Sequence, residues 1–193
     1  IGQFIDNDNV NVEHVLVIAI DTTGSMQKCL DAVRKSLIAS KRLLIASGIK
    51  LKIVIFGDYD KPSYKIDKVV NIFDGTVEEC VEYIDNVKLN TCGSGYDVAE
   101  AHISMLAKLV NEAKENERYS ILLWSDAIPH HISDKYDKKM AEYEEFALAI
   151  NYPEYPRTWE QAVEDFFRKG HVMGVITSPF VKQTKEISHT YEQ

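Results

Sequence analysis

The chain has 193 residues, of which 45% are hydrophobic, enough for one sizeable core and few for two. Its 30 acidic residues outnumber 22 basic ones and are spread along the chain, and the net charge of -8 argues against nucleic acid or anionic membrane as the main partner. We expect one domain over residues 1–193, with its core at about 13–177, and the charge is compatible with cation binding.

The longest apolar run, Val15 to Ile20, is far below the roughly 20 residues that span a bilayer, so no membrane insertion is expected. The polar, Asn-rich start at Ile1 has no signal-peptide character and favours a segment of a longer protein. Cys29, Cys80 and Cys92 lack metal-ligand spacing and are predicted to be reduced thiols in or near the core. Because the sequence also has no N-x-S/T acceptor, we expect an intracellular, cytoplasmic location.

Apolar runs predict five strands, four of which are nearly continuous in Val, Ile and Leu, as in a parallel sheet buried on both faces. In chain order they are His14 to Ile20, Leu51 to Phe56, Lys68 to Phe73, Tyr119 to Ser125, and His171 to Thr177. The third run lacks that continuity and follows the second by a connection too short for a crossover helix. We therefore expect it to pair antiparallel at an edge of the sheet.

Helical stretches separate these strands. In the first helix, apolar residues at helical spacing predict the face that packs on the sheet: Leu30, Val33, Leu37 and Leu44. Capping boxes predict three more helix starts: Thr76 with Glu79, Asp97 with Glu100 before a helix from Val98 to Val110, and Thr158 with Gln161. A further helix is predicted around Lys135 to Ala149.

This alternation of elements predicts an α/β fold. We expect a Rossmann-like, doubly wound and mainly parallel central sheet, with one antiparallel edge strand and helices on both faces. Numbering the five predicted strands along the chain, the expected strand order is 3-2-1-4-5.

Side chains with oxygen atoms follow the first strand directly: Asp21, Thr23 and Ser25. In a doubly wound sheet, ligands bind beyond the carboxyl ends of the strands. Alternate residues that leave a strand can turn toward a common point, and Gly24 permits the tight bend before the helix. Carboxylate and hydroxyl oxygens suit Mg²⁺, with Mn²⁺ or Ca²⁺ as further possibilities.

The stretch DTTGSM after an apolar strand resembles the metal-ion-dependent adhesion site of von Willebrand factor A domains, whose first loop reads Asp-x-Ser/Thr-x-Ser. ILLWSDAIPHH resembles the third metal loop, where a strand ends on an aspartate, here Asp126. TCGSGYDVAEA resembles the second loop in a branch of the family that has a Gly-rich turn and Asp in place of the usual Thr. IVIFGDYD resembles the acidic turn beside the site in that branch, which includes modules attached to atypical alpha-kinases. The likeness spans about Glu13 to Thr177.

The resemblance implies a Mg²⁺ site and a protein partner whose Asp or Glu completes the metal coordination, and it leaves the oligomeric state open. The implied ligands are Asp21, Thr23, Ser25, Asp97 and Asp126. In the second loop, Thr91, Ser94 and Asp97 compete for one role; Asp97 ranks first because it aligns with the Gly-Gly-Asp form of the branch, and Thr91 ranks second. Asp97 also fits an N-cap of the helix predicted after it, and the two roles are compatible.

Four more residues are expected at the rim of the site. We interpret Asp58 and Asp60 as turn formers or outer-shell acceptors for metal-bound water, because further direct carboxylates would over-neutralise a site that must stay electrophilic. His130 and His131 are interpreted as loop histidines, because the chain supplies too little nitrogen and sulfur for a soft-metal site.

The alternative to a binding module is an enzyme. A Mg²⁺-dependent phosphotransferase of the haloacid dehalogenase type also begins with an apolar strand and Asp-x-x-Gly-Ser/Thr, and would use Asp21 as its nucleophile. That mechanism needs a second acid two residues later, where this chain has Thr23. The sequence also lacks the G-x-x-x-x-G-K-[ST] and G-x-S-x-G motifs. We therefore favour cation-dependent binding and expect no catalytic residue.

Overall fold

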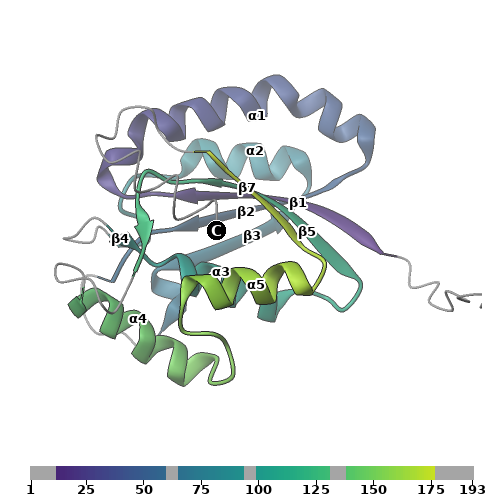
Figure 1. Cartoon of the computed structure of the whole chain (residues 1–193). Helices are drawn as coiled ribbons and strands as arrows, with labels where there is room; N and C mark the ends of the chain where they lie inside the picture. The colour runs from purple at the N-terminus through teal and green to yellow at the C-terminus, as the bar shows by residue number, and fades with distance from the viewer. Residues whose placement is uncertain (1–11, 60–64, 94–98, 131–137, 177–193) are drawn as a thin grey trace, which may run out of the picture.

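The computed structural model describes residues 12–59, 65–93, 99–130 and 138–176, and the structural statements below concern these residues. A five-stranded sheet in the order β3-β2-β1-β5-β7 forms its centre (Figure 1). The strands are β1 (Glu13–Asp21), β2 (Lys50–Phe56), β3 (Val70–Gly75), β5 (Glu117–Trp124) and β7 (Val172–Ile176). Only β3 runs antiparallel to its neighbour in this sheet. The predicted fold class, antiparallel edge and strand order are confirmed.

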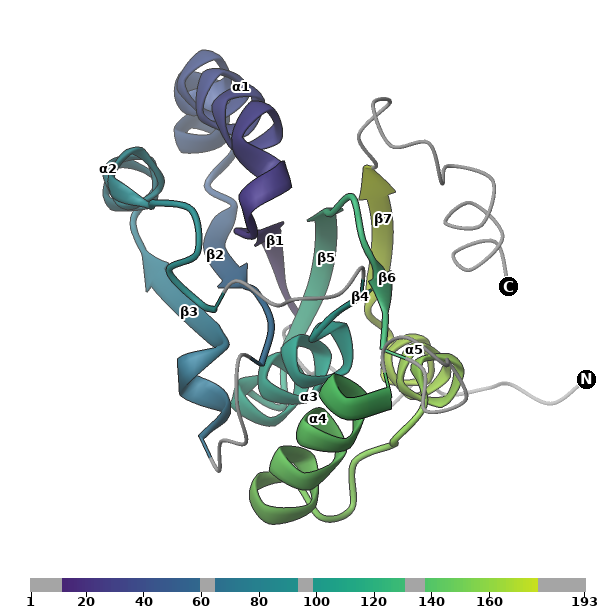
Figure 2. The ribbon, with the colours of Figure 1, turned by 90° about the vertical axis from the view of Figure 1, so that its left-hand side faces the viewer.

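Helices cover both faces of the sheet, with α1 and α2 on one side and α3, α4 and α5 on the other (Figure 2). Their bounds are α1 (Gln27–Ser47), α2 (Val77–Asn86), α3 (His102–Glu112), α4 (Lys138–Asn151) and α5 (Trp159–Arg168). Alternate β1 residues enter two separate cores: Val15, Val17 and Ala19 pack with α3 and α5, while Ile18 and Ile20 pack with α1 and α2. This burial on both faces explains why β1 is apolar from Val15 to Ile20.

The predicted buried face of α1 and the predicted starts of α2 and α5 are confirmed. In α1, Leu30, Val33 and Leu37 are buried and Leu44 packs beside them. The capping box before α2 is present, because the Glu79 amide donates to Thr76 Oγ1 and the Thr76 amide donates to Glu79 Oε2, at 3.2 and 2.8 Å. Thr158 caps α5 through the Gln161 amide, at 3.4 Å.

The capping box predicted from Asp97 and Glu100 is wrong. Glu100 lies in β4 (Ala99–Glu100), which pairs in parallel with β6 (Ile128–Pro129) as a second, two-stranded sheet. The Ala101 amide then donates to Gly57 O at 3.2 Å, and α3 begins only at His102. Because residues 99–101 pair with β6 and with Gly57, they stay extended, and α3 begins later in the chain than predicted.

The strands β1, β2, β5 and β7 differ from their predicted bounds by one or two residues, and β3 and α4 also have other bounds than predicted. The strand expected from Lys68 begins at Val70, because Ile66–Lys68 form a 3-10 turn, η2, that buries Ile66. The helix expected over residues 135–149 is described over Lys138–Asn151, and residues 135–137 lie outside the described part.

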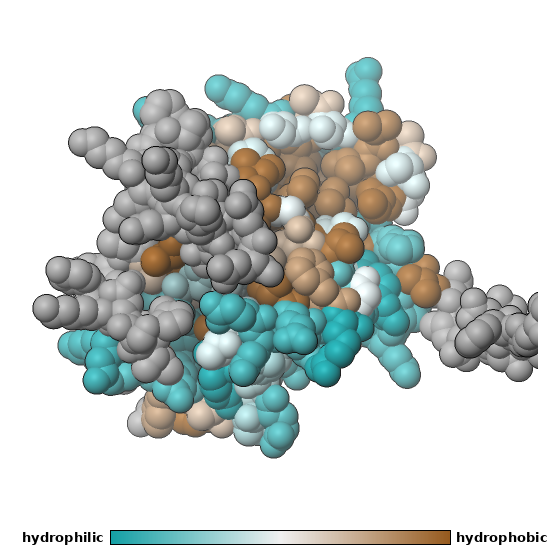
Figure 3. Space-filling model, in the orientation of Figure 1, coloured by the Kyte–Doolittle hydropathy of each residue, from teal (hydrophilic) through white to brown (hydrophobic). Residues whose placement is uncertain are grey.

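Apolar side chains gather between α1 and α5 in Figure 3, where β5 and β7 expose Leu122 and Val172 at 39% and 56%. None of the three cysteines is in a disulfide, and Cys80 and Cys92 are buried while Cys29 is half-buried, as predicted. No helix among the described residues is both long and apolar enough to cross a membrane.

Candidate functional site

The Asp21 carboxylate lies at the end of β1 and is fully buried. Its Oδ1 accepts hydrogen bonds from the Thr23 amide and the Thr23 hydroxyl, at 2.8 and 2.7 Å. Its Oδ2 accepts a third from the Ser125 hydroxyl, at 3.1 Å. These neutral donors orient the carboxylate but bring it no positive charge.

Burial raises the pKa of Asp21 from its ordinary value of 3.8 to about 7, and the charge of Asp126 adds to this increase. The hydrogen bonds from Thr23 and Ser125 act in the opposite direction and do not cancel the effect of burial on the pKa. A cation bound beside Asp21 would favour its ionised form, so cation binding near neutral pH would release a proton.

The first and third predicted metal loops meet at this carboxylate. Ser25 Oγ donates to Asp126 Oδ1 at 3.0 Å, across 101 positions of sequence. The two loops are neighbours because β1 and β5 pair in parallel, with Ile20 opposite Trp124 at their carboxyl ends. Since Ser25 is exposed and Asp126 half-buried, the group opens to solvent. The structure thus brings together Asp21, Thr23, Ser25 and Asp126.

The second loop is described only at its flanks, because Ser94 and Asp97 lie outside the described residues, as do Asp60 and His131. Its alternative ligand, Thr91, is exposed, and its hydroxyl donates to Lys88 O of the same turn at 2.6 Å. The Asn90 amide donates to Thr22 O at 2.6 Å, which ties the start of the second loop to the first.

His130 is not the rim residue that was predicted, and Asp58 is not exposed at the rim either, while its interpretation as a turn former or outer-shell acceptor stays a prediction. Both are buried, and His130 Nε2 lies 3.1 Å from Asp58 Oδ1. His130 Nδ1 lies 2.9 Å from Glu144 Oε2 on α4, a residue that the sequence analysis missed. The available signal was a single acid among Ala141, Ala147 and Leu148 on the buried face of that helix.

The donor set at the carboxyl end of β1 fits a hard divalent cation. Asp21 and Asp126 supply carboxylate oxygens, and Thr23 and Ser25 supply hydroxyls, which is the ligand chemistry of Mg²⁺. Within the described ranges, no three His, Cys, Asp or Glu side chains are grouped to hold a metal, so a site here depends on these hydroxyls.

No protein-family model and no curated protein sequence matches the chain. Two crystal structures of the pilus adhesin SpaC from Lactobacillus rhamnosus GG are similar over 62% of the chain. The open conformation gives a TM-score of 0.42 at 15% identity, and a second structure gives 0.44 at 14%. The chain matches only 15% and 16% of the length of these adhesin chains. Interpretation of the site therefore depends on its own geometry.

Proposed function

We propose that this chain is a divalent-cation-dependent protein-binding module. Mg²⁺ would be held by Asp21, Thr23, Ser25 and Asp126, directly or through bound water, and an acidic side chain of a partner protein would complete its coordination. The observation that supports this best is the Ser25–Asp126 hydrogen bond, which joins two loops beside the buried Asp21 carboxylate.

Charge explains why such a site would select an acidic partner. Hydroxyls and waters are neutral ligands, so they leave the ion electrophilic, and an incoming Asp or Glu gains an attraction that water cannot match. The likeness of DTTGSM and ILLWSDAIPHH to von Willebrand factor A loops, and of the acidic turn to the alpha-kinase branch, supports the same function. Three cysteines without a disulfide favour an intracellular location for this module.

The phosphotransferase alternative is not proposed. Its mechanism needs an acid two residues after the nucleophile, whereas the Thr23 hydroxyl donates to Asp21 Oδ1 at that position.

Calorimetric titration of Mg²⁺ and Mn²⁺ tests the cation site. We expect one ion per chain, with affinity reduced at least about tenfold (~1.4 kcal/mol) in Asp21→Asn. The matched control is Asp85→Asn, an exposed aspartate on α2, which should bind like wild type. No binding to wild type, or equal affinity in Asp21→Asn, would contradict the proposal.

A pull-down with the wild-type chain tests the acidic-partner step. A partner that binds in Mg²⁺ should be lost in EDTA and with Asp21→Asn, while circular dichroism shows that the domain stays folded. If the partner binds equally in all three conditions, the metal is not the recognition element. The exposed apolar side chains of α4, Phe146 and Ile150, then become the better candidate surface.

A further inference from the structure

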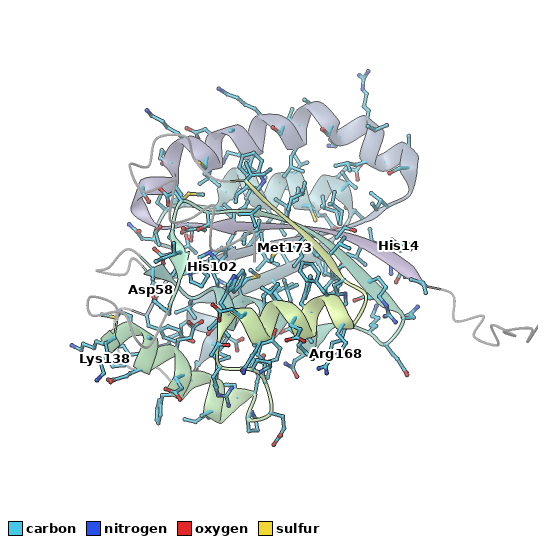
Figure 4. All side chains as sticks on the ribbon, viewed as in Figure 1. His14, Asp58, His102, Lys138, Arg168 and Met173 are labelled. Atoms are coloured by element: carbon cyan, nitrogen blue, oxygen red, sulfur yellow. The ribbon has the colours of Figure 1, made fainter. Side chains whose placement is uncertain are left out.

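A buried ion cluster of Asp58, His130 and Glu144 joins three separate segments of the chain. Asp58 follows β2, His130 follows β6, and Glu144 lies on α4. Figure 4 shows Asp58 toward the carboxyl ends of the strands, on the side of α4. No side chain of the cluster is more than 2% exposed. Water therefore does not screen the charges of these groups.

His130 supplies the positive charge of this cluster. Burial lowers its pKa, but contacts with Asp58 and Glu144 outweigh that effect and raise the pKa to about 10. The contact with Asp58 is an ion pair without hydrogen-bond geometry, and in the described part of the chain neither Asp58 oxygen accepts a hydrogen bond. Asp58 therefore depends on the imidazolium for charge compensation.

Glu144 connects the cluster to the start of α3. One carboxylate oxygen contacts His130 Nδ1, and the other accepts a hydrogen bond from the Ser104 amide at 2.7 Å. Ser104 lies in the first turn of α3, where free amides favour negative charge. Each carboxylate oxygen of Glu144 thus has its own partner, and these two contacts hold Glu144 in place beside His130.

The same cluster connects to the third loop of the candidate site and to the described flanks of the second loop. His130 ends the short segment that begins at Asp126, and β6 within that segment pairs with β4. Asp58 follows Gly57, whose carbonyl accepts from the Ala101 amide. A Cβ atom on Gly57 would lie 2.7 Å from Cys92 O, so the backbone after β2 packs directly on the flank of the second loop.

We propose that His130 is a positioning residue of the candidate cation site, which bridges Asp58 and Glu144 and thereby holds Asp126 beside Ser25. This inference rests on the proposed function. The Ser25–Asp126 hydrogen bond is exposed and competes with water, so it holds the loop weakly. The contacts of His130 are buried, and breaking them would leave two carboxylates without compensation.

Hydrogen exchange in EDTA tests the positioning without any cation. In His130→Gln, amides over residues 125–130 and 99–101 should exchange at least about tenfold faster, while those of Val17 and Ile18 in β1 keep their wild-type rates. The matched control is His171→Gln, a buried histidine before β7 whose Nδ1 accepts from the Tyr119 amide. That variant should leave exchange in the third loop unchanged.

Calorimetry with Mn²⁺ tests the consequence, at a temperature where circular dichroism shows each variant folded. We expect the Kd of His130→Gln to rise about tenfold and that of His171→Gln to stay at the wild-type value. Adding Asp58→Asn and Glu144→Gln to His130→Gln removes the two uncompensated charges and should restore part of the loop protection and affinity. If His130→Gln does not fold, hydrogen exchange and Mn²⁺ calorimetry are measured on Glu144→Gln, because this variant keeps the contact between His130 and Asp58.

Two results would overturn the inference: exchange that accelerates equally in β1 and the third loop, or an unchanged Kd in folded His130→Gln. If the wild type binds no Mn²⁺, the proposed function fails, and the exchange data alone then decide whether His130 fixes the loop.

Discussion

Replacing Asp21 with asparagine should stabilise the cation-free domain at pH 8. The folded-state pKa of Asp21 is about 7 against an ordinary value of 3.8, a rise of about 3 units. At ~1.4 kcal/mol per unit, ionisation of this buried group costs the folded state about 4 kcal/mol. Asparagine removes the charge, and its Oδ1 still accepts both bonds from Thr23.

The sign of the pH dependence follows from the raised pKa. Stability associated with the protonated carboxyl is fully present below pH 3.8 and is lost as the pH rises through about 7. The asparagine amide cannot accept from Ser125 Oγ, so that hydroxyl must turn, at a cost of about 1 kcal/mol. The net gain expected at pH 8 is therefore about 1 to 3 kcal/mol.

Urea unfolding in EDTA at pH 5 and pH 8 measures this effect. The free energy of unfolding of the wild type, taken relative to Asp21→Asn, should fall by roughly 3 kcal/mol between the two pH values. Other titrating groups are common to both proteins and cancel in the comparison. An Asp21→Asn protein that is less stable than wild type at pH 8, with the same pH dependence, would refute this reasoning.

Three further predictions concern stability and are measured by urea unfolding. Thr76→Ala should lower the free energy of unfolding by about 1 kcal/mol, because the Glu79 amide loses its acceptor, Thr76 Oγ1, while the backbone amide of residue 76 can still donate to Glu79; an unchanged midpoint would contradict this. The pKa of His130 is raised from 6.5 to about 10, so its stabilisation is fully present below pH 6.5 and is lost as the pH rises through about 10; His130→Gln should lack this alkaline loss. Gly93→Ala should destabilise by more than about 3 kcal/mol, because φ is +94° and the new Cβ would lie 2.0 Å from Asp58 O; a stability equal to wild type would show that this close approach relaxes freely.

The sheet was predictable because its signals are local. Continuous apolar runs mark buried parallel strands, whereas β3 lacks such a run and pairs antiparallel at the edge of the sheet. The start of α3 was not predictable in the same way. The Asp97 and Glu100 spacing favours a helix, but pairing of β4 with β6 and the Ala101–Gly57 bond override that local preference.

The same difference between local signals and long-range contacts applies to the candidate site. Asp21, Thr23, Ser25 and Asp126 follow the ends of two strands that any doubly wound sheet places together, so their meeting was predictable. The buried cluster around His130 was not, because charged residues are expected at the surface unless a partner is known. Its partners come from other elements, and although a lone acid on the apolar face of α4 marks Glu144 as unusual, no pattern in the sequence pairs it with His130 or Asp58.

The most direct test of the cation site is a crystal structure with Mn²⁺, recorded for its anomalous signal. We predict one peak between the first and third loops, in contact with the hydroxyls of Thr23 and Ser25 at about 2.1 Å, and close enough to Asp21 and Asp126 for direct or water-mediated ligation. A Mn²⁺-soaked crystal in which no neighbouring molecule covers these loops, and in which no anomalous peak lies beside Ser25, would contradict the proposed cation site.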